Sequence, residues 1–195
     1  MFSEFAKVSS ATWGVIVALL LVGIVVFAVS KDKKRWTARM LANGALCIAL
    51  STVLSFITLY KMPQGGSITL ASMLPMFLFA YAYGVGPGML VGAAYGFVQF
   101  LQGGLYFVHP VELLLDYPLA FAMLGLAGLS NKFSDQWGMI PGIILGTFGR
   151  FVCAFLSGLI FFGMYAPEGQ NVVIYSMVYN GLYLVPEAII CIVLA

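Results

Sequence analysis

Long apolar segments with hardly a charged residue inside them recur along nearly the whole chain. Of its 195 residues, 62% are hydrophobic and only 8% are charged, whereas about a quarter of the residues in a soluble domain carry a charge. So few charges cannot cover a water-exposed surface, so lipid must surround most of this chain. Because one spanning helix needs about 20 apolar residues, the length predicts six or seven transmembrane helices joined by short connections.

Polar, glycine and proline residues divide the apolar segments and predict where the helices end. An extra helix is expected over 11–30, followed by a polar hinge at 31–39. Six further helices are expected over about 39–59, 69–83, 86–102, 110–130, 139–163 and 171–195. The predicted fold is all-α and polytopic. Residues 1–36 form an extra N-terminal transmembrane helix with a basic hinge, and residues 37–195 form a six-helix membrane domain.

The lysine and arginine residues outside the helices are unevenly distributed between the two sides. One side carries Lys31, Lys33, Lys34, Arg35, Arg39 and Lys132. Only Lys7 and Lys61 fall on the other side. The positive-inside rule therefore places the hinge in the cytoplasm of a bacterial cell. The connections at about 60–68, 103–109 and 164–170 are then external. Polar, aromatic and small residues collect there, which predicts capture of a small solute near the outer face.

Four ionisable residues fall inside predicted helices: Glu112, Asp116, Arg150 and Glu187. A charged side chain at mid-helix costs at least about 2.5–3.5 kcal/mol and normally faces a cavity or a partner. Glu112 and Asp116 share one helix face, and either solvation or a binding role explains Glu112. Asp116 and Arg150 either line a solute site or pair across two helices. Glu187 lies far from the external connections, which favours a structural or partner contact.

The last predicted helix carries a polar face that continues several turns inward. Its members, Tyr175, Ser176, Tyr179, Asn180, Tyr183 and Glu187, fall within about 140° of one another at about 100° per residue. An interfacial aromatic belt would explain Tyr175 alone, so the deeper residues favour a binding wall. His109 precedes Pro110 at an external helix start, where an interfacial hydrogen-bonding role is expected rather than metal binding.

The sequence contains no pattern typical of an enzyme or an ATPase. Walker A, HExxH and GxSxG motifs are absent. Cys47, Cys153 and Cys191 lie in apolar segments without metal-ligand spacing. No cofactor or metal is therefore expected, and energy for uptake would come from a partner or an ion. Ala45 and Ala49 form a small-xxx-small face, which suits either a partner helix or packing within the chain.

Three stretches, in this order, are similar to a known family: MPQGGSITLASMLPMFLFAYAYG, GGLYFVHPVELLLDYPLAFAMLGLAGL and NGLYLVPE. They resemble the thiamine-specific substrate-binding (S) subunit of energy-coupling factor (ECF) vitamin transporters, the ThiT or YuaJ family, over about 37–195. The resemblance implies an S-component-like six-helix bundle that binds thiamine from outside with high affinity. It also implies a complex with a transmembrane coupling subunit and two ATPase subunits, and toppling of the S subunit to release thiamine inward.

The resemblance also implies roles for particular residues. The family's acidic–aromatic pair matches Asp116 and Tyr117, and the aromatic residue of the preceding connection matches Tyr106. The basic residue of the fifth core helix matches Arg150, and the asparagine of the sixth matches Asn180. These residues are therefore expected to bind the substrate.

Further matches and departures complete the expected site. The sixth-helix tyrosine matches Tyr175, whereas Phe162 stands where relatives have a tryptophan. Ala154 stands where they have a ring-stacking histidine, so His109 becomes a candidate for the missing imidazole.

The family's Ala-xxx-Ala coupling motif matches Ala45 and Ala49. This match implies that the coupling subunit docks on the first core helix.

Thiamine is chemically suited to such a site. Its thiazolium ring is permanently cationic, and a carboxylate in a low-dielectric pocket attracts a fixed cation. The rings of Tyr106, Tyr117 and Phe162 can stack on the ligand, each adding cation–π attraction of about 0.5–2 kcal/mol. Asn180 offers a donor and an acceptor to the aminopyrimidine edge.

Two other functions remain open from the sequence. The same architecture can serve another vitamin or a thiamine precursor, such as riboflavin or a hydroxymethylpyrimidine. An autonomous secondary transporter would instead use Asp116 and Arg150 as a proton-coupled pair. A membrane enzyme is disfavoured because the chain has no catalytic constellation, and the small net charge of +2 gives no reason to expect nucleic acid.

Overall fold

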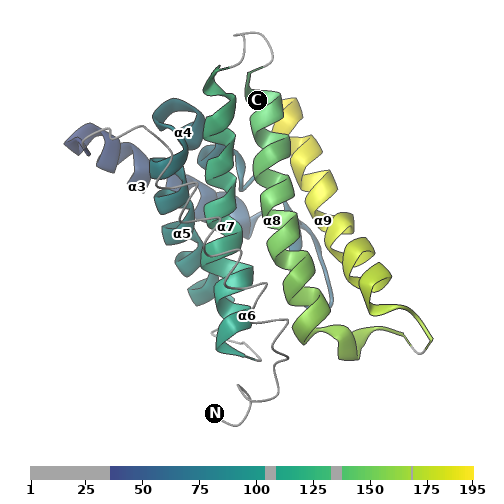
Figure 1. Cartoon of the computed structure of the whole chain (residues 1–195). Helices are drawn as coiled ribbons and strands as arrows, with labels where there is room; N and C mark the ends of the chain where they lie inside the picture. The colour runs from purple at the N-terminus through teal and green to yellow at the C-terminus, as the bar shows by residue number, and fades with distance from the viewer. Residues whose placement is uncertain (1–35, 104–108, 133–137, 168) are drawn as a thin grey trace.

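The computed structural model describes residues 36–103, 109–132, 138–167 and 169–195, and their helices pack into one bundle (Figure 1). In chain order the elements are α3 (Ala38–Phe56), β1 (Thr58–Lys61), β2 (Ser67–Thr69), α4 (Leu74–Tyr83), α5 (Val85–Gln102), α6 (Pro110–Leu114), the π-helix η1 (Leu115–Leu119), α7 (Ala120–Ala122), the 3₁₀-helix η2 (Met123–Lys132), α8 (Met139–Phe161), the 3₁₀-helix η3 (Gly163–Tyr165) and α9 (Val172–Leu194). The extra helix predicted over 11–30 lies outside the described residues and stays a prediction.

The described part of the chain has the helices that its apolar segments predict. Four of them, at 38–56, 111–131, 139–161 and 172–194, are long and apolar enough to cross a membrane. The second is the continuous run from α6 to η2. The apolar helix α4 is shorter, with 10 residues, and α5 has 18. Together they account for the six helices predicted within 37–195, and the all-α polytopic fold class is confirmed.

A short antiparallel hairpin replaces the predicted start of the second core helix. Strands β1 and β2 pair between α3 and α4, so the helix expected from residue 69 begins at Leu74. Gly65 and Gly66 turn the hairpin with φ angles of 97° and 77°, a region that favours glycine. The Met62 N–H donates to the Gly66 carbonyl at 3.0 Å and closes the loop.

The fourth spanning segment is irregular at its centre. Pro118 lies inside η1, where it has no N–H to donate and its ring would clash with the carbonyl of a regular α-helix. The chain widens there into a π turn, and the Ala120 N–H reaches the Leu115 carbonyl. π turns of this kind commonly redirect side chains at functional sites. The π turn η1 carries Asp116 and Tyr117 directly after the end of α6.

Glycines on one face of α5 let this irregular segment approach closely. A Cβ at Gly96 would lie 2.6 Å from the Tyr117 carbonyl oxygen, and one at Gly88 would lie 3.0 Å from the Gly125 Cα. Between them, a Cβ at Gly92 would collide with the Phe121 carbonyl oxygen. Backbone contact of this kind is how small residues bring helices together in lipid. The position of Asp116 in the bundle therefore depends on α5.

The helices alternate in direction, so their ends meet in two groups. One group contains the last residues of α3, α5 and α8 together with the first residues of α4, α6 and α9. It includes the hairpin and lies toward the lower end of Figure 1, where α6 begins and η3 links α8 to α9. We call it the cavity end.

Adding a methyl group at Gly96 tests the close contact of α5 with η1. Because the Cβ would lie 2.6 Å from a carbonyl oxygen, Gly96→Ala should lower the free energy of unfolding by about 1–3 kcal/mol, as overpacking does. Thermal unfolding in detergent measures this. Gly181→Ala is the matched control, because a Cβ there meets nothing within 4 Å and alanine favours a helix by about 0.5–1 kcal/mol. Equal stability of the two variants would contradict the prediction.

Candidate functional site

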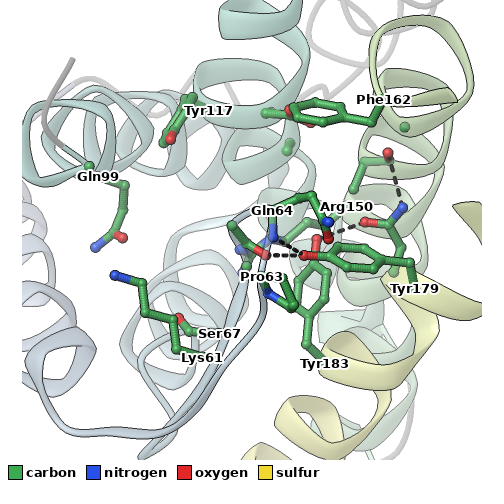
Figure 2. A pocket seen from close by; sticks show the side chains of 18 of the residues that line it. Lys61, Pro63, Gln64, Ser67, Gln99, Tyr117, Arg150, Phe162, Tyr179 and Tyr183 are labelled. Atoms are coloured by element: carbon green, nitrogen blue, oxygen red, sulfur yellow. Dashed lines mark hydrogen bonds between the residues drawn. The ribbon is translucent and has the colours of Figure 1, made fainter. Parts of the chain in front are cut away.

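A cavity of about 710 Å³ lies at the cavity end of the bundle. Small-molecule sites typically measure about 300–1,000 Å³, so it can hold an organic solute. Its walls come from the end of α3, the hairpin, α5, α6, η1, α8 and α9 (Figure 2). The residues used below as lining residues are Lys61, Pro63, Gln64, Gly65, Gly66, Ser67, Gln99, Glu112, Asp116, Tyr117, Arg150, Ala154, Phe162, Tyr175, Tyr179, Asn180 and Tyr183.

The structure gathers most of the residues that the sequence analysis selected. The cavity is lined by Asp116, Tyr117, Arg150, Phe162, Tyr175 and Asn180. Tyr106 lies outside the described residues. His109 is not among the lining residues, so its contact with a ligand stays a prediction.

His109 instead begins α6. Its Nδ1 accepts a hydrogen bond from the Val111 N–H at 3.1 Å, and its own N–H donates to Glu112 Oε2 at 3.1 Å. The imidazole stacks on Phe161, with 5.3 Å between ring centroids. A capped helix start fixes the direction of α6. His109 thus helps to orient the segment that carries Asp116.

Asp116 is the central acidic group of the cavity. Its Oδ2 accepts a hydrogen bond from Ser157 Oγ at 2.8 Å, which ties η1 to α8. Glu112, one turn earlier, also lines the cavity. Among the described residues no salt bridge joins Asp116 to Arg150. The carboxylate can therefore attract a cationic ligand without first breaking an ion pair with that arginine.

Arg150 enters the same cavity from α8 (Figure 2). Its guanidinium carbon lies 4.1 Å from the centroid of the Phe121 ring, which is cation–π distance. The aromatic face offsets part of the charge, and the guanidinium N–H groups remain suited to a neutral acceptor. A carboxylate and a guanidinium that both line one cavity can orient a polar ligand.

Aromatic rings form much of the remaining wall. Figure 2 shows Tyr117 and Phe162 at the same side of the cavity, Tyr117 from η1 and Phe162 from the end of α8. Tyr117 is held edge-on by Phe100, with centroids 5.4 Å apart, and Phe162 contacts Tyr165 at 6.0 Å. Flat rings supported by other rings are suited to stacking on a planar ligand.

Asn180 lines the cavity, yet its amide group is already bonded within the protein. Nδ2 donates to the Ser176 carbonyl at 2.9 Å and to the Ala154 carbonyl at 3.3 Å. Oδ1 accepts from Tyr183 Oη at 3.0 Å. Asn180 therefore joins α9 to α8 and fixes the Tyr183 hydroxyl.

The hairpin supplies the part of the site that the sequence analysis missed. Lys61, Pro63, Gln64 and Ser67 line the cavity from it, and Gln99 faces Lys61 from α5 (Figure 2). The Gly65–Gly66 pair was the available signal, because adjacent glycines between short β-prone stretches are typical of hairpins. The apolar flanks of this segment instead favoured a loop followed by a helix.

Comparisons with known proteins relate the sequence and the fold to one family. The family described as "Thiamine transporter protein (Thia_YuaJ)" matches residues 41–195. The thiamine transporter ThiT of Bacillus subtilis (strain 168) is 36% identical over 160 residues, covering 75% of this chain and 83% of that protein. ThiT of Lacticaseibacillus paracasei is 32% identical over 123 residues, or 56% of this chain and 61% of that protein.

A solved structure shares the fold. The structure of ThiT from Listeria monocytogenes superposes with a TM-score of 0.68 at 27% sequence identity. The superposition covers 80% of this chain and 90% of that one.

Removing the Asn180 amide tests whether this residue is primarily a structural link. Asn180→Ala removes the link from α9 to the Ala154 carbonyl and leaves the buried Tyr183 hydroxyl without its acceptor. An unsatisfied buried polar group costs about 1–3 kcal/mol, so the ligand-free protein should lose stability on that scale in thermal unfolding. Tyr175→Phe is the comparison variant and should leave the stability unchanged. A ligand-free Asn180→Ala protein as stable as wild type would show that the amide does not hold the wall.

Proposed function

Because this chain belongs to the thiamine transporter family, we propose that it captures thiamine in the cavity beside Asp116, as the substrate-binding subunit of an ECF vitamin importer. Membership makes it a multi-pass membrane transport protein and not an enzyme, as the sequence analysis predicts. The observation that carries the proposal is a carboxylate within the bundle, turned to a cavity with aromatic walls.

Charge complementarity supports thiamine as the ligand. Asp116 meets the cavity without an ion pair to Arg150, and the thiazolium ring carries a permanent positive charge. Between unit charges 4 Å apart, the attraction is about 4 kcal/mol at an effective dielectric constant of about 20, against about 1 kcal/mol in water. A partly enclosed cavity thus strengthens this pair over the same pair in solvent.

The rings and the polar groups around Asp116 have complementary roles in the proposal. Tyr117 and Phe162 stack on the planar rings of thiamine, and an aromatic face adds about 0.5–2 kcal/mol for a cation. Arg150 donates to a neutral pyrimidine nitrogen, which keeps its charge away from the thiazolium. Tyr175 and Asn180 complete the wall on α9. Tyr106 and His109 stay in the expected set as predictions.

We further propose that the cavity end faces outward. Arg39, in the first turn of α3, lies at the opposite end of the bundle, and the other basic residues of the hinge precede it in the sequence. The positive-inside rule places that end in the cytoplasm. Thiamine would then reach Asp116 from outside, past the hairpin.

The docking surface for a coupling subunit is proposed on α3. Ala45 and Ala49 are exposed on this helix, beside large exposed apolar side chains such as Leu41, Leu46 and Val53. Ala45 also lines an apolar groove of about 300 Å³ between α3 and α5. Small residues allow another helix to pack closely. The chain has no nucleotide-binding motif, so the ATPase subunits of the complex would supply the energy.

The alternative of a proton-coupled secondary transporter receives no support from the geometry. A coupled pair would place the Asp116 carboxylate beside the Arg150 guanidinium, yet Asp116 bonds to Ser157 and Arg150 lies over Phe121.

Neutralising Asp116 tests the proposed ligand contact. Asp116→Asn keeps the side-chain shape but removes the charge that attracts the thiazolium ring. The dissociation constant for thiamine should rise at least about tenfold, equivalent to about 1.4 kcal/mol, while the protein still folds. Isothermal titration of purified protein measures the affinity, and thermal unfolding without ligand is the control. Unchanged affinity would remove Asp116 from the thiamine site.

Enlarging Ala45 tests the docking surface separately from the binding site. Ala45→Leu fills the exposed face of α3 and blocks close helix approach, while the cavity stays intact. Thiamine binding in detergent should match wild type, whereas thiamine uptake by the complete complex in vesicles should fall to background. Leu46→Ala, on the same exposed part of α3, serves as the control for a size change. Normal uptake by Ala45→Leu would place docking elsewhere.

A further inference from the structure

A buried carboxylate that does not line the cavity holds the base of the hairpin. Glu187, on α9, is 2% exposed. Its Oε2 accepts the Thr69 N–H at 2.5 Å, and its Oε1 accepts the Thr69 hydroxyl at 2.5 Å. Oε1 also accepts the Ser72 hydroxyl at 3.2 Å. The side chain thus bonds the end of β2 and the turn that leads into α4.

A carboxylate suits this set of groups. A carboxylate is purely an acceptor, with room for several donors, whereas a glutamine amide presents two N–H groups on one side. The Thr69 N–H and two hydroxyls can all donate to Glu187, whereas a glutamine would replace one acceptor oxygen by an N–H group and force the hydroxyl at that position to accept instead. Hydrogen bonds to a charged group are also stronger than neutral ones.

The same face of α9 contacts the hairpin at two further points. Tyr179 Oη accepts the Gln64 N–H at 2.9 Å and donates to the Gly65 carbonyl at 2.7 Å. A Cβ added at Gly66 would lie 2.9 Å from the Tyr183 ring, which shows how closely that ring covers the loop. Tyr179, Tyr183 and Glu187 are spaced by four residues and share one helix face. The hairpin is thus bonded to α9 from its tip to its base.

The hairpin forms one wall of the cavity, so its anchor affects the ligand. Lys61 and the loop residues Pro63 to Ser67 line the cavity from this wall. Met62 is not a lining residue; it is buried and packs with Ala154, Tyr183 and Leu184. A hairpin released from α9 would both open the wall and expose Met62.

We propose that Glu187 is a positioning residue that fixes the hairpin wall through Thr69 and Ser72, and thereby sets how long a ligand stays in the cavity. The effect on ligand release rests on the proposed thiamine binding. The anchoring of the hairpin by Glu187 is independent of which ligand the cavity binds. Differences in affinity between variants of one site reside mostly in the dissociation rate, so a loosened wall acts chiefly on release.

Two measurements on Glu187→Gln test the proposal. In a Met62→Cys protein without ligand, maleimide labels the buried thiol only when the hairpin opens, and the signal of the native cysteines is subtracted. Glu187→Gln should raise this labelling rate about tenfold, the factor that corresponds to about 1.4 kcal/mol. Thiamine dissociation, measured by stopped flow, should accelerate by a similar factor, with a much smaller change in association.

Variants of Thr69 keep the test decisive if Glu187→Gln fails to fold. Thr69→Ser retains both donors and should behave like wild type, whereas Thr69→Val loses the hydroxyl and should label faster. Combining Thr69→Val with Glu187→Gln should add less than the sum of the two effects, because both break one network. Additive effects, or no effect of Thr69→Val, would overturn the proposal.

Ser130→Ala separates hairpin release from general loosening. Ser130 is buried, donates to the Ala127 carbonyl at 2.7 Å and lies in η2, away from the hairpin. Labelling at Met62→Cys should not change in this variant, and an equal rise there would overturn the role of Glu187. If Glu187→Gln labels faster but the wild-type protein does not bind thiamine, the proposed function is overturned and the anchoring role stands.

If the wild-type protein binds thiamine but Glu187→Gln labels at the wild-type rate, the anchoring role is overturned and the proposed function stands.

Discussion

A carboxylate inside a membrane bundle constrains everything around it. Asp116 can stay there only because it faces a cavity and accepts a hydrogen bond from Ser157, since a lipid-facing charge costs several kcal/mol. The π turn at Pro118 presents the side chain, and the glycines of α5 let that turn approach the neighbouring backbone. The candidate binding site is thus a consequence of backbone packing at a depth where unpaired polar groups cost several kcal/mol.

Helix α9 combines two tasks on one face. Tyr175 and Asn180 contribute to the cavity wall, while Tyr179 and Glu187 bond the hairpin that closes another side. The polar stripe predicted along this helix is therefore both a cavity wall and an anchor for the hairpin. Glu187 shows how a carboxylate can lie inside the bundle away from the cavity: three converging donors satisfy it.

At two positions of the cavity wall this chain differs from the family pattern, and both differences concern aromatic side chains rather than the acidic and basic residues Asp116 and Arg150. Ala154 is small and its carbonyl accepts from Asn180, and Phe162 supplies a ring without a polar edge. His109 is engaged in capping α6. The rings of Tyr117 and Phe162 then remain for the proposed stacking, and the charged residues on the described walls are Lys61, Glu112, Asp116 and Arg150.

The sequence by itself predicted the membrane environment, the order of the helices and the polar helix ends that would meet on one side, while the resemblance to the family implied several individual site residues. Apolar length, the cost of a buried charge and helical periodicity are properties of neighbouring residues in the chain, so they can be read without a structure. Tertiary structure alone decided that Asp116 bonds Ser157, that Asn180 bonds the Ala154 carbonyl, and that the hairpin over 58–69, for which Gly65–Gly66 is the local signal, is bonded to Glu187 of α9. Each of these depends on contacts between residues far apart in the sequence, such as Thr69 with Glu187. Local patterns carry no information about which distant donor reaches which acceptor.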